Sequence, residues 1–104
     1  MTTEPTASDP NVLVRDMGYT EAEWLRVLPA AMGHWPWKQE GRRVEAQAAG
    51  GGLLELSWAP LPSRRLGLAV IPRMEVVFRG NDIAAEEFAE WLARFDLYTR
   101  RGGG

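Results

Sequence analysis

The chain has 104 residues, of which 45% are hydrophobic and 25% are charged, and its formal net charge at pH 7 is −2. A chain of this length accommodates one hydrophobic core. It contains no cysteine, which excludes disulfides, thiolate metal sites and cysteine nucleophiles. The polar N-terminus has no signal-peptide core, and no apolar run approaches the roughly 20 residues of a membrane helix. We therefore expect a single-domain cytoplasmic protein with no membrane association.

The two ends of the chain differ from the segment between them. Residues 1–10 contain two prolines and no hydrophobic periodicity, and residues 99–104 contain no apolar side chain. We expect a disordered leader, a single folded domain over residues 11–98 and a flexible Arg/Gly tail. The first residues of that domain, "NVLVRD" (11–16), fit either a short strand or an extended lead-in.

A helix is predicted to begin within "YTEAEW". Thr20 and Glu23 form the pattern of a capping box, in which a hydroxyl and a carboxylate each bind an otherwise unpaired backbone amide. Apolar residues then recur at helical spacing as far as Gly33, which is a typical stop. We expect a helix over about residues 20–32, bent at Pro29, because proline removes one backbone hydrogen bond.

Between residues 43 and 79 the hydrophobic period changes to two, which is typical of strands with one buried face. The segments "AAGGG" (48–52) and "APLPS" (59–63) have turn-forming compositions. They divide this region into three predicted strands.

The third predicted strand contains Pro72. The apolar residues at even positions from 66 to 78 share one face if the strand continues through Pro72, bent or bulged there. A hairpin at Pro72 with a three-residue loop preserves the same pattern and remains an alternative. A continuous strand would be longer than its neighbours and would expose part of its edge.

A second helix is predicted after "GND" (80–82), with Asn81 or Asp82 as the N-cap. Its apolar stripe consists of Ala84, Phe88, Trp91, Leu92 and Phe95. The element order α-β-β-β-α, with one alternating sheet face, predicts a two-layer α+β domain with an antiparallel sheet and both helices on one face.

The segment "GHWPWK" (33–38) contains the first candidate contact residues. Trp35 and Trp37 could present an aromatic face to a ligand, a base or a proline-rich peptide, or they could cover the corner between helix and sheet. His34 has no acid or nucleophile near it in sequence and no cysteine to share a metal site, which favours a linker role. A small-molecule site between helices and sheet, near His34 and Trp58, is a further hypothesis.

Two arginine pairs start two of the predicted strands, Arg42–Arg43 and Arg64–Arg65. If those ends are neighbours, the arginines form a basic edge that suits nucleic acid. The domain is acidic overall, however, and it has no nucleic-acid-binding signature. Basic residues on exposed strands also prevent edge aggregation.

The sequence contains no nucleotide-binding or hydrolase motif. Its strand carboxylates are scattered, and sequence does not show that any two of them meet for acid–base chemistry. We expect no catalytic residues, no cofactor and no metal, and therefore a protein that is not an enzyme.

The C-terminal "YTRRGGG" resembles the diglycine end of ubiquitin-like and thiocarboxylate carrier proteins. That family has a β-grasp fold whose last strand delivers the glycines, whereas here they follow a predicted helix. The segments "FDLYTRRGGG" and "RRLGLAVIPRMEVVF" also resemble small bacterial proteins, a likeness that implies no known activity.

Taken together, the sequence favours a small binding or accessory protein that self-associates through its sheet. We expect either a homodimer or a complex with another protein. The long strand supplies the edge, and outward-facing Leu53, Ile71 and Val77 supply apolar contacts. Nucleic-acid binding through the arginine pairs and tryptophans is the alternative.

Overall fold

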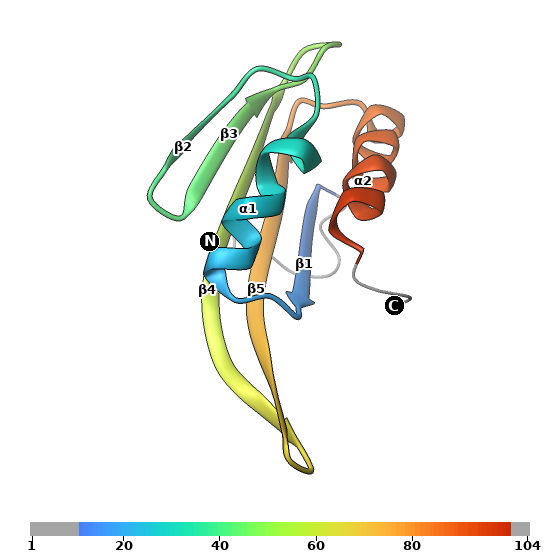
Figure 1. Cartoon of the computed structure of the whole chain (residues 1–104). Helices are drawn as coiled ribbons and strands as arrows, with labels where there is room; N and C mark the ends of the chain where they lie inside the picture. Colours follow the sequence, from blue (N-terminus) through green and yellow to red (C-terminus); the bar gives the residue numbers. More distant parts are fainter. Residues whose placement is uncertain (1–10, 101–104) are drawn as a thin grey trace, which may run out of the picture.

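The computed structural model describes residues 11–100, and the predicted leader and residues 101–104 of the predicted tail lie outside the described residues. The elements in chain order are β1 (Val12–Met17), α1 (Glu21–Met32), β2 (Trp37–Glu40), β3 (Arg43–Gln47), β4 (Leu53–Leu66), β5 (Ala69–Asn81) and α2 (Ala85–Thr99). The strands form one antiparallel sheet in the order β1-β5-β4-β3-β2 (Figure 1). The predicted α+β class is confirmed, with five strands in the described residues instead of the three expected.

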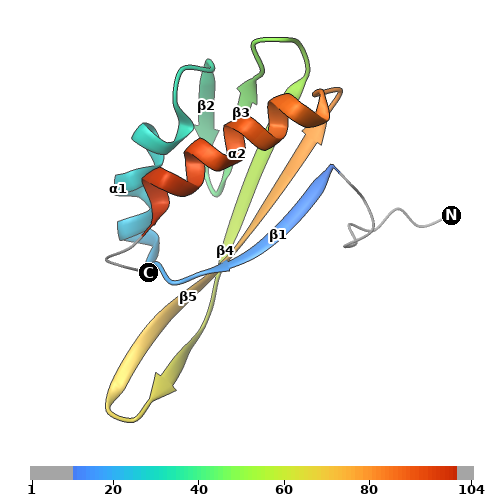
Figure 2. The ribbon, with the colours of Figure 1, turned by 90° about the vertical axis from the view of Figure 1, so that its right-hand side faces the viewer.

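The two helices lie on one face of the sheet, as predicted (Figures 1 and 2). The alternating residues of β4 explain this arrangement. Leu54, Leu56 and Trp58 are buried beneath the helices. Glu55 and Ser57, which lie between them, point to the opposite face. This alternation follows from the two-residue period of a strand. We call the face away from the helices the outer face.

Aromatic side chains join the two layers. The ring of Phe78 on β5 lies 5.2 Å from Phe95 and 6.3 Å from Trp91, both on α2. Trp24 on α1 lies 5.9 Å from Phe95 and 5.6 Å from Trp58. The contacts to the sheet are edge-on, a geometry that aromatic rings prefer, and the Trp24–Phe95 contact joins the two helices to each other.

The predicted start of α1 is confirmed. The amide of Glu23 donates to the Thr20 hydroxyl (3.1 Å) and the Thr20 amide donates to the Glu23 carboxylate (2.9 Å). The helix ends at Gly33, whose φ of +78° favours glycine. The Arg94 guanidinium binds two carbonyls of the last turn, those of Ala30 and Ala31.

The predicted cap of α2 was wrong. Its N-cap is Ala84, which offers no side-chain hydrogen bond. Asn81 is the last residue of β5, and Asp82 occupies a turn with φ of +61°. Ile83 follows and is buried in the core, and the helix begins only after this anchor.

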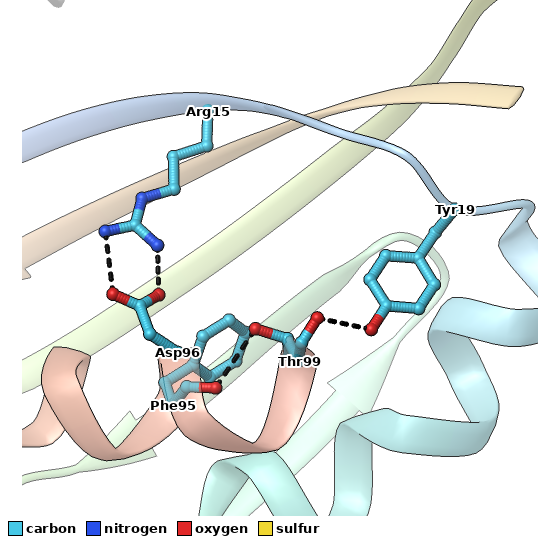
Figure 3. Close-up of polar contacts among 5 residues, drawn as sticks. All are labelled: Arg15, Tyr19, Phe95, Asp96 and Thr99. Carbon is cyan, nitrogen blue, oxygen red and sulfur yellow. Dashed lines mark hydrogen bonds and ion pairs between the residues drawn. The ribbon is translucent and has the colours of Figure 1, made fainter. Parts of the chain in front are cut away.

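The C-terminal end of α2 is fixed to the rest of the fold by two polar contacts (Figure 3). The Tyr19 hydroxyl donates to the Thr99 carbonyl (2.6 Å). Arg15 on β1 forms a two-pronged ion pair with Asp96, with one contact of 3.1 Å. Thr99 is buried and is the last helical residue, so the ordered helix includes the first residue assigned to the tail.

Two strands were missed or left open in the sequence. Residues 11–16 proved to be strand: β1 pairs with β5 from Val12 to Met17. Strand β2 has no buried residue and three exposed ones out of four, so its hydrophobic pattern is too weak to predict an edge strand.

The expected connection at residues 59–63 does not exist, because β4 continues through it to Leu66. The turn lies at Gly67–Leu68, where Gly67 has a φ of +61°, as tight hairpin turns require. Strand β5 is continuous through Pro72, as the face argument favoured, and the alternative hairpin at that residue is wrong. The strand begins at Ala69, so Leu66 belongs to its partner strand.

Candidate partner-binding surface

The end of the β4–β5 hairpin projects beyond both helices (Figures 1 and 2). Strand β1 ends opposite Met74 and β3 ends opposite Ser57. Within the described residues 11–100, residues 61–73, which we call the arm, therefore have no strand neighbour other than each other. Every residue from 62 to 70 is exposed. The arm is a two-stranded ribbon with no other element of the sheet beside it.

The arm exposes large apolar side chains. Leu66 is 57% exposed, Val70 is 58% exposed and Leu68 at the turn is fully exposed. Leu61 and Ile71 are half-buried. Leu66 and Val70 lie on opposite faces of the ribbon, so exposed apolar side chains are present on both of its faces.

A bulge divides the arm into two differently patterned segments. Leu61 pairs with Arg73 and Arg64 pairs with Ile71, so Pro62 and Ser63 together oppose Pro72. Because of the extra residue, even-numbered side chains of β4 point to the helix-side face before the bulge and to the outer face after it. Beyond the bulge, Arg64 lies on the outer face with Ile71, and Arg65 lies on the helix-side face with Val70.

Both edges near the base of the arm lack a hydrogen-bond donor. The Trp58 amide donates to the Arg42 carbonyl on β3 (3.1 Å), and the Gly80 amide donates to the Asn11 carbonyl beside β1 (2.8 Å). Alternate amides of a strand point the same way. Pro60 on β4 and Pro72 on β5 therefore occupy positions whose amides would point out of the two edges, and proline has none.

These edges change the basis of the self-association predicted from the sequence. Strand β5 is not longer than all of its neighbours, because β4 pairs with it along nearly its whole length. Its free edge on the β1 side begins at Arg73, next to Pro72. Strand addition at the base of the arm is therefore disfavoured.

No helix within residues 11–100 covers the outer face of the sheet (Figure 2). At its centre Val77 lies between Val14 on β1 and Ser57 on β4, so it faces away from the helices as predicted. Val14 is 50% exposed. A hollow of about 210 Å³ beside Val77 includes Arg43 and Arg79 in its lining. Along the ladder, the Leu61–Arg73 pair at the base of the arm has the same facing as Val77, and the bulge follows it.

The base of the arm is fixed by an ion pair. Arg73 binds the Asp16 carboxylate at 2.6 Å. The hydrogen bond from Arg73 lowers the pKa of Asp16, and the charge of Arg64 acts in the same direction. The same hydrogen bond raises the pKa of Arg73. Arg73 is thus largely neutralised, whereas Arg64 and Arg65 make no ion pair within residues 11–100.

The predicted basic edge does not form, because the two arginine pairs are far apart. Arg43 pairs with Ser57 in the ladder, and Arg64 lies seven residues further along β4, which corresponds to roughly 23 Å. Both Arg64 and Arg65 lie near the end of their strand, so the prediction that they start one was wrong.

Arg42 and Arg43 are bound by carboxylates. Arg43 contacts Glu45 (2.7 Å) and Glu55. Arg42 donates to Glu21 at 2.8 Å and 2.9 Å, and Trp58 Nε1 donates to the same carboxylate at 2.9 Å. The Arg42 hydrogen bond, followed by that of Trp58, lowers the pKa of Glu21 to about 2. This network joins the start of α1 to β3 and β4.

The aromatic candidates pack against the body. Trp35 stacks on Trp91 with ring centroids 5.7 Å apart, and Trp37 is half-buried against the core. His34 is exposed in the turn after α1. Trp58 contacts the opposite end of that helix through its bond to Glu21. The 12-residue helix separates His34 from Trp58 by about 18 Å, so the structure does not bring these two candidates together.

Within residues 11–100, no group of three or more His, Cys, Asp or Glu side chains is arranged to hold a metal ion. No helix in this part of the chain is long and apolar enough to cross a membrane. Comparison with protein families, with curated proteins and with solved structures found no match to this chain.

Sequence reasoning missed the arm because the prolines of "APLPS" were interpreted as a connection. Two signals point to the arm. Gly67 lies between apolar runs, as in a tight hairpin turn. Pro60 and Pro62 are compatible with a strand that has a free edge. Recognition of that free edge requires knowledge of where β3 stops, which the sequence does not show.

Proposed function

We propose that this protein is a small non-enzymatic binding or accessory protein whose binding element is the arm. The observation that carries the proposal is the projecting ribbon with exposed Leu66, Leu68 and Val70. Apolar side chains on the faces of a strand pair suit contact with another protein. The absence of cysteine is compatible with a reducing cytoplasm, which cell fractionation would test.

The energetics of the arm support this role. An isolated two-stranded hairpin is marginally stable in water, and ordering its backbone costs about 1–2 kcal/mol per residue. The arm buries none of its residues from 62 to 70, so those residues recover little of this cost within the monomer. Docking against a partner would bury its apolar residues and stabilise the ordered ribbon.

The test uses a protein with a shortened arm. Residues 61 and 73 are hydrogen-bonded partners by the alternation of amides described above, and such a pair closes a two-residue type I′ turn. Replacement of residues 62–72 by Asn-Gly therefore removes most of the arm and leaves the ladder from Pro60–Met74 onward intact.

The full-length and shortened proteins are each used to capture partners from a lysate of the source cells. Every candidate is then purified and titrated against both proteins by calorimetry. We expect an identified protein that binds the full-length chain at micromolar or tighter Kd and binds the shortened chain at least about tenfold more weakly. Equal binding to both would show that the arm is not the binding element.

Nucleic-acid binding is the second candidate, and one observation favours it. The arm carries three arginines and no acidic residue, for a net charge of +3. The other nine basic and all 14 acidic residues lie elsewhere, so the rest of the chain carries −5 and repels a polyanion. We expect weak, strongly salt-dependent binding of labelled RNA and DNA. Submicromolar binding that is lost in Arg64→Ala/Arg65→Ala would reverse this ranking.

A further inference from the structure

We propose that the arm docks on a second copy of this chain, with the outer faces of two sheets packed against each other across a two-fold axis. This inference rests on the proposed binding role of the arm and identifies its partner. The reason for a second copy is complementarity: the arm is basic, and the rest of the chain has the opposite charge.

The complementarity is also present on the outer face itself. The body part of this face carries more carboxylates than basic groups. Apart from Asp16, which is paired with Arg73, the carboxylates are Glu40, Glu45, Glu55 and Glu75, and the basic groups are Lys38, Arg43 and Arg79. On the arm, the outer face carries Arg64 and, at the base, the neutralised Arg73. An arm laid across another copy's body therefore meets opposite charge.

The lengths of the two parts also agree. The arm portion of β4, residues 61–66, spans about 20 Å, and its body portion, residues 53–60, spans about 26 Å. A two-fold axis at the base of the arm places each arm over the other body. Sheets packed in this way lie about 10 Å apart with their strands nearly aligned. The contact is isologous and closes as a dimer.

The ladder register identifies which residues would meet. With the axis at the Leu61–Arg73 pair, the next outer-face pair toward the turn contains Arg64, and the next toward the body contains Glu75. One step further out on each side are Leu66 and Val77. The Arg64–Ile71 pair of each copy then lies over the Ala59–Glu75 pair of the other, and the Leu66–Ala69 pair lies over the Ser57–Val77 pair. Opposite charges and apolar groups are matched at equal distances from the axis.

Pro60 and Pro72 support this face-to-face arrangement over strand addition. They remove outward-pointing donors from both edges at the base of the arm, where a continuous intermolecular sheet would have to form. They leave the outer face accessible, because neither prolyl ring lies on it: both residues have the facing of the buried Met74.

The test is a charge exchange followed by sedimentation velocity between about 5 and 200 µM. The wild-type chain is expected to shift with concentration from 11.6 kDa to twice that mass. Arg64→Glu and Glu75→Arg should each weaken the dimer by at least about tenfold. The double variant should recover most of that loss, because the two charges exchange places.

Arg65→Glu is the matched control. It makes the same charge change one residue away, but Arg65 lies on the helix-side face with Val70, so it should reduce association by no more than about threefold through long-range charge alone. Circular dichroism and melting curves establish that every variant is folded.

A wild-type chain that remains at 11.6 kDa throughout this range overturns the dimer, as does a double variant no better than the single ones. The proposed function fails separately, in the capture and titration experiment. A monomer whose arm binds another protein refutes only the dimer, whereas arm-independent binding refutes the proposed function.

Discussion

The two-layer body and the arm belong to the same pair of strands, yet different forces order them. In the body, alternate residues of β4 are fully buried beneath the helices; in the arm, every residue from 62 to 70 is exposed. The backbone hydrogen-bond ladder is common to both regions. Hydrophobic burial is therefore what separates a structural part of this hairpin from a part available for binding.

The sharpest test of this comparison is a leucine-to-alanine substitution in each region, Leu56→Ala in the body and Leu68→Ala in the arm. Leu56→Ala removes a side chain that is 0% exposed and should lower the free energy of unfolding by about 2–5 kcal/mol, because it leaves a cavity in a packed core. Chemical denaturation monitored by tryptophan fluorescence measures it. A loss below about 1 kcal/mol would contradict the packing described for the body.

A smaller effect is expected at the contact that fixes the end of α2. Tyr19→Phe removes the hydroxyl that donates to the Thr99 carbonyl and should cost about 1–2 kcal/mol, because that buried carbonyl loses its bond to the hydroxyl. Hydrogen exchange should quicken at the end of α2 and remain unchanged in the arm. Equal acceleration in both regions would show that they are coupled.

A third, pH-dependent effect is expected at Glu21. Its pKa is lowered from 4.5 to about 2, so its carboxylate stabilises the fold above pH 4.5 and loses that contribution as the pH falls toward 2. Glu21→Gln should lower the Tm by a few degrees at pH 7 and by almost nothing at pH 2. A difference that persists at pH 2 would exclude the ion pair with Arg42 as its cause.

Two control variants sharpen this test. Trp58→Phe keeps an aromatic ring and removes the second donor to Glu21, so it should show part of the same pH dependence. Glu90 is exposed on α2 and makes no ion pair within residues 11–100. Glu90→Gln should therefore leave the Tm unchanged at both pH values.

The smallest effect belongs to the arm. Leu68→Ala removes a fully exposed side chain and should change the free energy of unfolding by less than about 0.5 kcal/mol. The same denaturation experiment as for Leu56→Ala measures it, in dilute solution. A loss comparable to that of Leu56→Ala would mean that the turn packs against the body.

The sequence predicted those elements whose signals are local. The capping box of Thr20 and Glu23 gave the start of α1, and the alternation of Leu54, Leu56 and Trp58 gave the buried face of β4. The shared face of the even-numbered apolar residues indicated that the strand continues through Pro72, although it begins at Ala69 and not at Leu66. Each depends on residues within a few positions of one another, so the chemistry that forms the element is contained in the segment itself.

The candidate site was predicted less well. Val77 was correctly placed on the face away from the helices, and the outward-facing apolar residues were noted. The arginine pairs were expected together and lie roughly 23 Å apart. The aromatic residues near His34 pack against the body, with Trp35 stacked on Trp91 of α2, a contact between residues far apart in the chain.

By itself, then, the sequence determined the α+β class, the position of α1 and the facing of the central strands, because periodicity and capping are properties of short segments. Only the tertiary structure decided where β1 and β3 stop, and hence that β4 and β5 continue beyond them as an arm. Strand ends depend on pairing between distant segments. Pro60, for example, indicates a turn when only the local sequence is considered. Once the neighbouring strands are known, it is a strand residue at a free edge.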